Sequence, residues 1–281
     1  MKILFCGDVV ARPGRAVIKK YIPYLRKQWS LDCVIVNGEN SQHGFGLSEK
    51  TANELFDSGV DVITTGNHVW DCKDLLSYIE QEPRIIRPLN FIESVPGRGF
   101  FINKTQIGNV LVINAMGQVF MNPQLDNAFP IIRQLLNSYK IGSNQIKAII
   151  VDFHAEATAE KIALAYYLDG LVTAVIGTHT HVPTADERIL PNGTAFISDV
   201  GMCGDYASII GFSLSTIGHR YLKKIPMIEK PGPSTGPATL CGVIIETNDE
   251  TGACSKISAV RLDGAINGTI NGTGSNQIYV Q

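Results

Sequence analysis

The sequence lacks any apolar run long enough to cross a bilayer, and Met1–Phe5 is too short for the apolar core of a signal peptide. We therefore expect a cytoplasmic protein with no membrane partner. The chain also lacks a large excess of charge of either sign, since the formal net charge is −2 at pH 7. Such a chain has no general attraction for nucleic acid or an anionic membrane, so any phosphate-bearing ligand must be held by local groups.

The six cysteines include no Cys-x-x-Cys pair, and several stand in apolar runs. This pattern favours free, buried thiols over a thiolate zinc site or a disulfide framework. The 281 residues are 44% hydrophobic and 18% charged, which argues against disorder through the whole chain. The length allows one large domain or two small ones.

Short apolar runs alternate with helical patterns along most of the chain, which predicts an α/β fold. The runs predicted to be strands that end in polar residues are Lys2–Cys6, Leu31–Val36, Val60–Thr65, Ile146–Phe153 and Leu171–Ile176. The predicted helices are Arg15–Trp29, Glu49–Asp57 after an N-cap at Ser48, a helix from an N-cap at Asp71 to Glu80, Asp126–Tyr139 and Glu156–Leu168. We expect Pro23 to kink or break the first helix.

Other runs predict antiparallel or mixed pairing. They are Arg84–Phe91, Phe100–Asn103, Val110–Asn114, a hairpin of Arg188–Leu190 with Thr194–Ile197, and two closing strands, Leu240–Glu246 and Ile257–Leu262. We predict a single domain over residues 1–262. Residues 263–281 repeat a short Asn-Gly-Thr unit that cannot bury a core, so we predict a flexible low-complexity tail.

Ligand-capable side chains follow five of the predicted strands, and Gly177-Thr178-His179-Thr180-His181 is the most informative of these segments. Two histidines two residues apart on an extended segment point to the same side. In an open α/β sheet the ligand crevice lies outside the carboxyl ends of the strands. The residues expected there are Asp8, Glu39, Asn40, Asn67, His68, His154, His179 and His181.

Without His68, these residues make seven oxygen or imidazole-nitrogen ligands, whereas one structural zinc ion needs only four. The set favours two divalent or trivalent ions about 3.5–4 Å apart, with Glu39 as the bridging carboxylate. Without thiolates, iron, manganese or zinc are the expected metals. Such a pair lowers the pKa of a shared water and stabilises charge on phosphoryl oxygens. An imidazole, whose ordinary pKa is about 6.5, suits the general acid, and His68 stands beside Asn67.

Each residue alone has a simpler interpretation. Asp8, Asn40 and Asn67 are typical turn formers, Glu39 a typical loop acid, and His154 a typical histidine at a strand end. For His43 and His219, which have no partner motif, we keep the simpler interpretation. The loop 41–47 and the uncharged loop Met116–Pro123 are both expected as walls of the site.

The blocks Gly7-Asp8, Gly38-Glu39-Asn40, Gly66-Asn67-His68, His154 and Gly177-Thr178-His179-Thr180-His181, in this order, resemble the calcineurin-like metallophosphoesterases. The strings NGENSQHGFG, TTGNHVWD, DFHAEATAEK, GTHTHVPTAD and DVGMCGDY resemble the bacterial YmdB-like phosphodiesterases more narrowly. The resemblance extends from Met1 to about Leu262. It implies a four-layer αββα sandwich, hydrolysis of 2′,3′- or 3′,5′-cyclic nucleotides, an RNA-linked regulatory role and a homo-oligomer.

Two positions depart from the broad superfamily. Val10 stands where the first block usually has histidine, and Glu39 where the second usually has aspartate. The YmdB-like resemblance implies that Asn40 replaces the missing histidine, and the oxygen-rich first site then favours iron or manganese over zinc. We assign Asp8, Glu39, Asn40 and His181 to one ion and Glu39, Asn67, His154 and His179 to the other.

Three functions remain open from the sequence. The first is a dimetal cyclic nucleotide phosphodiesterase with His68 as the acid. The second is a phosphomonoesterase or nucleotidase on the same site, because pocket shape rather than chemistry decides which ester fits. The third is a metal-dependent regulator that binds a nucleotide or RNA without cutting it.

Overall fold

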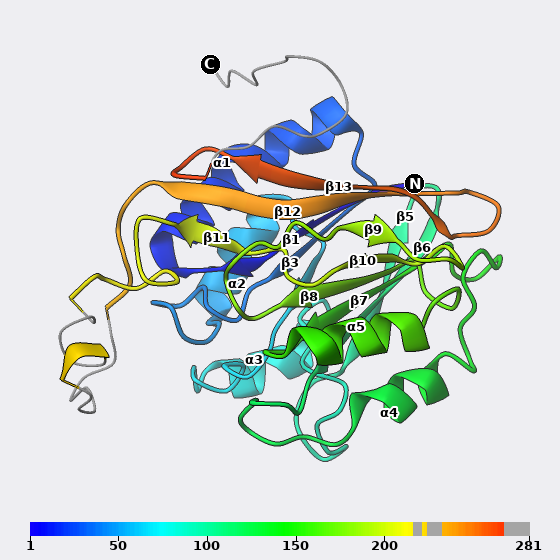
Figure 1. The fold of residues 1–281 in the computed structure, drawn as a ribbon, viewed down its shortest axis with the longest axis horizontal. Helices are drawn as coiled ribbons and strands as arrows, with labels where there is room; N and C mark the ends of the chain where they lie inside the picture. The colour runs from blue at the N-terminus through cyan, green and yellow to red at the C-terminus, as the bar shows by residue number, and fades with distance from the viewer. Residues whose placement is uncertain (216–220, 224–231, 267–281) are drawn as a thin grey trace.

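Two mixed β-sheets face each other and are covered on their outer sides by helices, as Figure 1 shows in the computed structural model. The structure describes residues 1–215, 221–223 and 232–266. The arrangement confirms the α/β class and the predicted αββα sandwich. Within the described residues, no helix has the length and apolarity that a bilayer crossing requires.

The first sheet has the order β2-β11-β12-β1-β3-β4, with β13 paired to β12. Its strands are β1 (Lys2–Cys6), β2 (Asp8–Val9), β3 (Cys33–Asn37), β4 (Val62–Thr64), β11 (Met202–Asp205), β12 (Ala238–Thr247) and β13 (Cys254–Leu262). β1, β3 and β4 are parallel neighbours, so their carboxyl ends reach the same edge. β12 runs antiparallel between β1 and β13.

The second sheet has the order β5-β6-β7-β8-β10-β9. Its strands are β5 (Phe100–Thr105), β6 (Gly108–Met116), β7 (Ala148–His154), β8 (Ala174–Thr178), β9 (Arg188–Ile189) and β10 (Ala195–Ile197). β6, β7, β8 and β10 are parallel, whereas β5 and β9 pair antiparallel at the two edges. The predicted β5–β6 and β9–β10 pairings are therefore confirmed.

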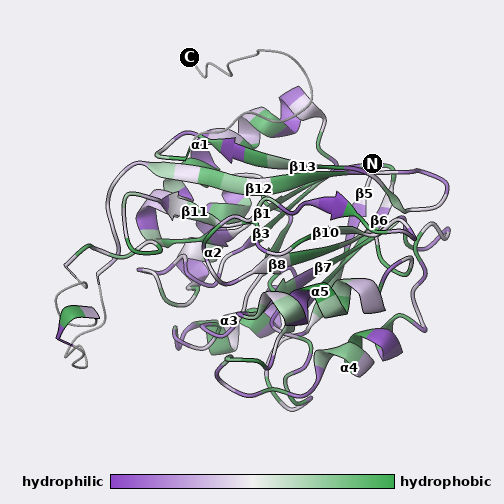
Figure 2. Ribbon diagram, viewed as in Figure 1, coloured by the Kyte–Doolittle hydropathy of each residue, from purple (hydrophilic) through white to green (hydrophobic). Residues whose placement is uncertain are grey.

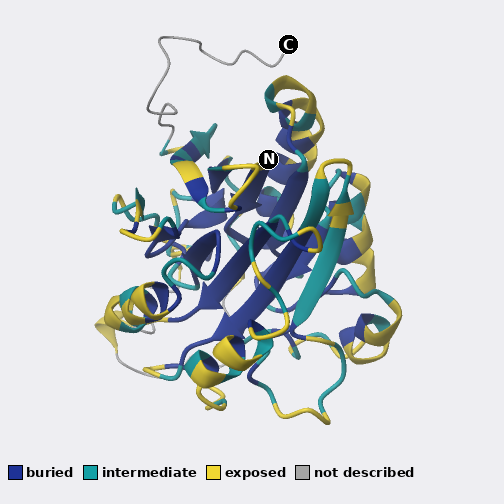
Figure 3. Ribbon diagram, turned by 90° about the vertical axis from the view of Figure 1, so that its right-hand side faces the viewer, coloured by how far each residue is buried: buried dark blue, intermediate teal, exposed yellow. Residues whose placement is uncertain are grey.

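Five helices form the outer layers of the described structure: α1 (Ala11–Trp29), α2 (Glu49–Asp57), α3 (Leu75–Gln81), α4 (Ala128–Leu135) and α5 (Thr158–Tyr167). Their apolar faces and the alternating side chains of the strands make three large cores, and Val10, Ala11 and Met202 form a smaller cluster. One core joins α1, α2 and α3 to the first sheet, one lies between the sheets, and one joins α4 and α5 to the second sheet. Figure 2 shows the apolar strands at the centre, and Figure 3 shows exposed surface concentrated on helices and loops.

The alternation is clear in β1, where Ile3 and Phe5 face the second sheet while Leu4 and Cys6 face the helices. Because both faces of the central strands are covered, these strands are continuous apolar runs in the sequence. This is why the sequence predicted them well.

Several predicted boundaries are wrong. α1 begins at Ala11, before Pro13, and continues through Pro23 without a break. The run Arg84–Phe91 forms only isolated bridges, at Ile85 and Ile86, instead of a strand. β2 and β11 were not predicted, because two and four residues are too few to show a period.

Some predicted helix ends are confirmed and others are wrong. Ser48 caps α2 as predicted, and its side chain accepts from the Thr51 backbone N–H at 3.2 Å. The N-cap of α3 is Asp74 and not Asp71, and α3 has no side-chain cap. Most of the predicted tail lies outside the described residues, although Asp263, its first residue, contacts Lys20 of α1 at 2.6 Å. The domain boundary at residue 262 stays a prediction.

Candidate metal centre

The first sheet supplies oxygen donors from the carboxyl ends of three parallel strands. Asp8 follows β1 and pairs with β11, Glu39 and Asn40 follow β3, and Asn67 follows β4. Asp8, Glu39 and Asn40 are buried, at 0%, 1% and 2% exposure, and Asn67 is half-buried. Carboxylates this deeply buried need a compensating cation or hydrogen-bond donors.

The second sheet supplies nitrogen donors. His154 is the last residue of β7, and His179 and His181 follow β8. His154 is fully buried, His181 is buried and His179 is half-buried. Since β7 and β8 are parallel neighbours, their ends bring these imidazoles to one edge of the second sheet.

Residues from both sheets meet around one atom, the Nε2 of His154. Three other atoms that could bind a metal ion lie close to it: Glu39 Oε1 at 3.0 Å, Asn67 Oδ1 at 2.9 Å and His179 Nδ1 at 3.0 Å. One proton on this nitrogen cannot satisfy three neighbours at once. Ligand atoms of Glu39, His154 and His179 all lie within 4.8 Å of one another, as a shared metal ion would require.

Each of the three histidines is held at its other ring nitrogen. A second hydrogen bond of this kind fixes the ring orientation and leaves one nitrogen facing the site. The three pairs are His154 Nδ1 with Thr178 Oγ1 at 2.9 Å, His179 Nε2 with Glu156 Oε2 at 3.2 Å, and His181 Nδ1 with the Ile210 carbonyl at 2.8 Å.

The Thr178 hydroxyl is itself held from behind. It donates to Asp152 Oδ1 at 2.7 Å, so it is free to accept from His154. Asp152 also accepts from the Asn37 amide at 3.1 Å and from the Thr64 hydroxyl. Burial raises the pKa of Asp152 to about 7. The chain from Asp152 through Thr178 to His154 therefore positions a predicted ligand from inside the protein.

A second group lies around Asp8, whose Oδ1 is 4.0 Å from Nε2 of His181. The Asn40 side-chain amide donates to the Gly44 carbonyl at 3.0 Å, which leaves its own oxygen available. Asp8 Oδ1 and Asn40 Oδ1 are buried and have no hydrogen-bond partner among the residues that the structure describes. Unpaired buried oxygens are costly, and a bound cation beside them removes that cost. The residues thus fit a metal ion here as well.

Several predicted ligands have shifted pKa values in the metal-free protein, as expected where protons and metal ions compete for the same atoms. Burial would raise the pKa of Glu39, but the adjacent His154 outweighs it and holds this pKa at about 2. Burial would lower the pKa of His154, yet Glu39 and Asp8 raise it to about 9. Burial, with His154 close by, lowers the pKa of His179 to about 3. For Asp8, burial raises the pKa against the opposing influence of His181 and His154.

Gly66 makes the meeting of the two sheets possible. A Cβ at this position would lie 2.3 Å from Cδ2 of His154 and 2.4 Å from Oε2 of Glu39. Any side chain would therefore push the carboxylate and the imidazole apart. The glycine in the Gly-Asn-His block is explained by this close approach.

A cavity of about 240 Å³ opens beside these residues. His68 lines it, with its backbone N–H donating to Glu39 Oε2 at 3.1 Å and its Nδ1 lying 3.3 Å from Asp71. Phe45, Ile210 and Phe212 form an apolar wall. The predicted wall at loop 41–47 is thus present through Phe45, whereas Met116–Pro123 does not line this cavity.

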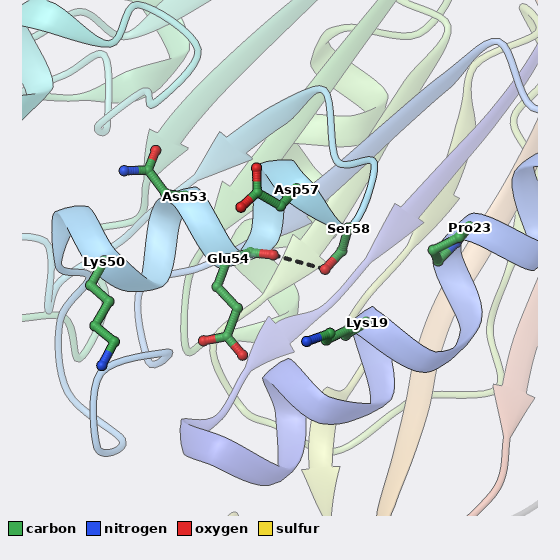
Figure 4. A pocket seen from close by; sticks show the side chains of 7 residues that line it. All are labelled: Lys19, Pro23, Lys50, Asn53, Glu54, Asp57 and Ser58. Carbon is green, nitrogen blue, oxygen red and sulfur yellow. Dashed lines mark hydrogen bonds between the residues drawn. The ribbon is translucent and has the colours of Figure 1, made fainter.

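A second hollow, of about 570 Å³, lies between α1 and α2. Figure 4 shows Lys19 and Glu54 pointing into it and the Ser58 hydroxyl bonded to the Glu54 carbonyl. It brings none of the predicted ligands together. His43 is exposed and lines neither hollow, and His219 lies outside the described residues.

The sequence did not single out Glu156, Thr178 or Asp152 for these roles, nor the carbonyl of Ile210. Glu156 is an exposed acid near a helix start, which is common on surfaces. A backbone carbonyl leaves no trace in a sequence. Thr178 and Asp152 carried a weak signal, since each is a polar residue within an otherwise apolar strand.

A family model described as YmdB-like protein matches residues 4–260 of the chain. A protein of Bacillus subtilis (strain 168), named 2′,3′-cyclic-nucleotide 2′-phosphodiesterase, is 44% identical over 263 residues. The match covers 94% of this chain and 97% of the relative.

Two solved structures are similar over nearly their whole length. One, of a protein from Thermus thermophilus, has a TM-score of 0.86 and 38% identity and covers 94% of this chain and 100% of that one. The other is described as a novel phosphatase of Mycoplasma pneumoniae. It has a TM-score of 0.86 and 36% identity and covers 94% of this chain and 93% of that one.

Proposed function

The chain belongs to the YmdB-like family of metallophosphoesterases and is a hydrolase of phosphoric esters, and from this premise we propose that it hydrolyses cyclic nucleotides with two bound metal ions. The preferred substrates are 2′,3′-cyclic nucleoside monophosphates, with 3′,5′-cyclic nucleotides as the related alternative. The B. subtilis relative at 44% identity has the corresponding name.

The observation that carries the proposal is the meeting of donors from both sheets around His154 Nε2. Three lone-pair-bearing atoms within 3.0 Å of one imidazole nitrogen make sense when a cation lies among them. One ion would be held by Glu39, Asn67, His154 and His179. The other would be held by Asp8, Glu39, Asn40 and His181, where two buried oxygens lack partners.

When bound, the ions supply a hydroxide near neutral pH and positive charge against the phosphoryl oxygens. The oxygen-rich donor set favours iron or manganese, with zinc as the alternative. Glu39 is suited to the bridging role because its two oxygens face different neighbours, Oε1 the His154 ring and Oε2 the His68 N–H.

His68 supplies the proton that the leaving oxygen needs. It lines the cavity, and its backbone is tied to Glu39, so its ring stays near the reacting phosphorus without entering the ligand set. The nearby Asp71 carboxylate, 3.3 Å from Nδ1, orients the ring so that Nε2 can deliver the proton.

The apolar wall accounts for the nucleoside part of the substrate. The Phe45 ring stacks on Phe212 with centroids 5.0 Å apart and meets His68 edge-on, also at 5.0 Å. A base lying against Phe45 would place its ribose phosphate toward His68 and the metal ligands. Aromatic contacts of this kind contribute about 0.5–1.5 kcal/mol beyond burial.

The test combines elemental analysis of protein purified without added metal with a screen of three esters: 2′,3′-cyclic nucleotides, nucleoside monophosphates and an aryl phosphodiester. We expect two metal ions per chain and the highest kcat/KM on the cyclic nucleotides. Preference for monoesters would instead support a phosphatase, which is how the M. pneumoniae relative is described. Metal binding without hydrolysis of any ester would leave only the regulatory function.

A further inference from the structure

Lys161 is fully buried on α5, at 0% exposure, although lysine ordinarily keeps its ammonium group in water. Its Nζ lies 2.9 Å from Oδ2 of Asp199, which is also buried. A buried ion pair costs desolvation and adds little stability compared with apolar side chains of similar volume. Stability alone therefore does not explain why the chain places a charged pair here.

Asp199 connects this pair to the metal centre. Its Oδ2 also accepts the backbone N–H of Thr180 at 3.0 Å, and its Oδ1 accepts the N–H of Gly201 at 2.8 Å. Thr180 stands between His179 and His181. The carboxylate of Asp199 thus holds the middle of the segment that carries two predicted ligands.

The segment His179–His181 has a strained backbone that needs support from its surroundings. His179 has φ of 104° and His181 has φ of 64°, both in the left-handed region that side-chain-bearing residues seldom adopt. A strained backbone persists only where its surroundings fix it. In this conformation Nδ1 of His179 lies 3.0 Å from Nε2 of His154, and Nε2 of His181 lies 4.0 Å from Oδ1 of Asp8.

The base of the same segment is shaped around Lys161. A Cβ on Gly177 would lie 3.0 Å from Cδ of Lys161 and 1.8 Å from the Ser198 carbonyl oxygen. Gly177 therefore leaves room for the lysine stem to pass beneath the end of β8 and reach Asp199. The glycine, the lysine and the aspartate form one support.

We propose that Lys161 and Asp199 are a positioning pair that keeps the His179–His181 segment in its strained, metal-binding conformation. Asp199 acts through the Thr180 amide, and Lys161 acts by holding the side chain of Asp199 in place. The inference rests on the proposed metal-dependent function, because its effect is on the geometry of the ligands.

The first test is Asp199→Asn. Asparagine has nearly the same shape but only one acceptor oxygen, so it cannot accept from both Thr180 and Gly201, and it leaves Lys161 without a counterion. Mn²⁺ binding is measured on metal-stripped protein by competition with a chromogenic chelator, at a temperature where the variant is folded. We expect the affinity for Mn²⁺ to fall about 10–100-fold, as for other residues that orient metal ligands.

The second readout is hydrogen exchange at the Thr180 amide in metal-free protein. It should be protected in the wild type and exchange faster in Asp199→Asn. The matched control is Asp61→Asn, which breaks the half-buried pair with Arg26 at the opposite, amino-terminal end of β4. That variant should lower the melting temperature while leaving both Mn²⁺ affinity and Thr180 exchange unchanged.

A merely structural role gives a different result. If Asp199→Asn melts earlier but binds Mn²⁺ within twofold of the wild type, the positioning role is wrong. If Asp199→Asn does not fold, Lys161→Met with Asp199→Asn removes both charges, leaves no unpaired ion and is judged by the same affinity criterion. Wild-type protein that binds no metal would refute the proposed function instead. In that case, a protected Thr180 amide would still support the role of Asp199, and an unprotected one would exclude it.

Discussion

The two halves of the candidate metal centre are built differently. The first sheet contributes oxygen donors, Asp8, Glu39, Asn40 and Asn67, at or just after strand ends, and none of these four has a positive φ. The second sheet contributes imidazoles, two of which lie on a strained segment. All three imidazoles are held at their far nitrogen by partners outside the predicted ligand set.

This difference has a physical cause. A carboxylate can bind a cation through either oxygen and over a range of angles, whereas an imidazole binds only along the lone pair of one nitrogen. The nitrogen half of the site, which consists of His154, His179 and His181, therefore requires more support from the surrounding structure. Within the nitrogen half, His154 should be the residue whose proton competes with metal, because its pKa is raised to about 9 in the metal-free protein whereas that of Glu39 is held at about 2.

The largest loss of activity is expected from a change at Glu39, whose carboxylate contacts His154 between the two halves. Glu39→Gln keeps the shape of the side chain but removes the charge that faces His154. We expect kcat/KM to fall by roughly 10³-fold with loss of metal, because the bridging charge is absent from both ions. Folding should be retained, as judged by circular dichroism.

The matched control for this change is Glu82→Gln, which removes a half-buried acid paired with Arg84 at 2.6 Å. It should leave activity within about twofold, because Glu82 does not line the cavity beside the predicted ligands. Wild-type turnover by Glu39→Gln after rigorous removal of metal would contradict the bridging role.

The next effect separates metal binding from proton delivery. His68→Ala should lower kcat for cyclic nucleotides by roughly 10²-fold, as expected for loss of a general acid, with metal content unchanged. An aryl phosphodiester has a good leaving group that needs no proton, so its turnover should change far less. Equal losses on both substrates would show that His68 acts on the ligands and not on the leaving oxygen.

The positions of the four residues of the oxygen half, Asp8, Glu39, Asn40 and Asn67, could be predicted from the sequence. Each of its residues comes directly after an apolar run and a glycine or another ligand, and parallel strands carry such positions to one edge. The central strands were equally clear, since both faces are covered. The run Arg84–Phe91 was misread because apolar content alone does not tell a strand from an extended segment that makes single bridges.

The support of the nitrogen half could not be predicted. Lys161 on a helix is typical of a solvated face, and nothing local shows that it is buried against Asp199. The anchor of His181 is a backbone carbonyl, Ile210, which has no residue-type signal. Positive φ at non-glycine residues is likewise a product of the tertiary structure.

A pH experiment sharpens the comparison between the halves. In metal-free protein the pKa of His154 is about 9, so at pH 8 the ring carries a proton that metal must displace. The pKa values of Glu39, about 2, and His179, about 3, mean that these groups are already deprotonated there. Metal affinity should therefore rise with pH, by about tenfold per unit, until pH 9, and then level off.

Calorimetry in buffers of different ionisation enthalpy measures this directly. We expect release of about one proton per chain when metal binds at pH 8. No buffer dependence of the binding enthalpy would mean that His154 binds no metal or is already neutral.

The smallest effect is expected outside both halves. Phe45→Ala removes the ring that stacks on Phe212 and should raise KM for cyclic nucleotides about two- to tenfold, with kcat little changed. Metal affinity should remain at the wild-type value. An aryl diester without a base serves as the internal control, and an equal rise in its KM would argue against a base-binding role.

The two-ion site is tested most directly by anomalous diffraction from a crystal of the protein loaded with Mn²⁺. We expect two peaks, one within about 2.3 Å of ligand atoms from Glu39, His154 and His179, and one beside Asp8, Asn40 and His181. A single peak ligated by one sheet alone, or metal bound elsewhere on the chain, would contradict it.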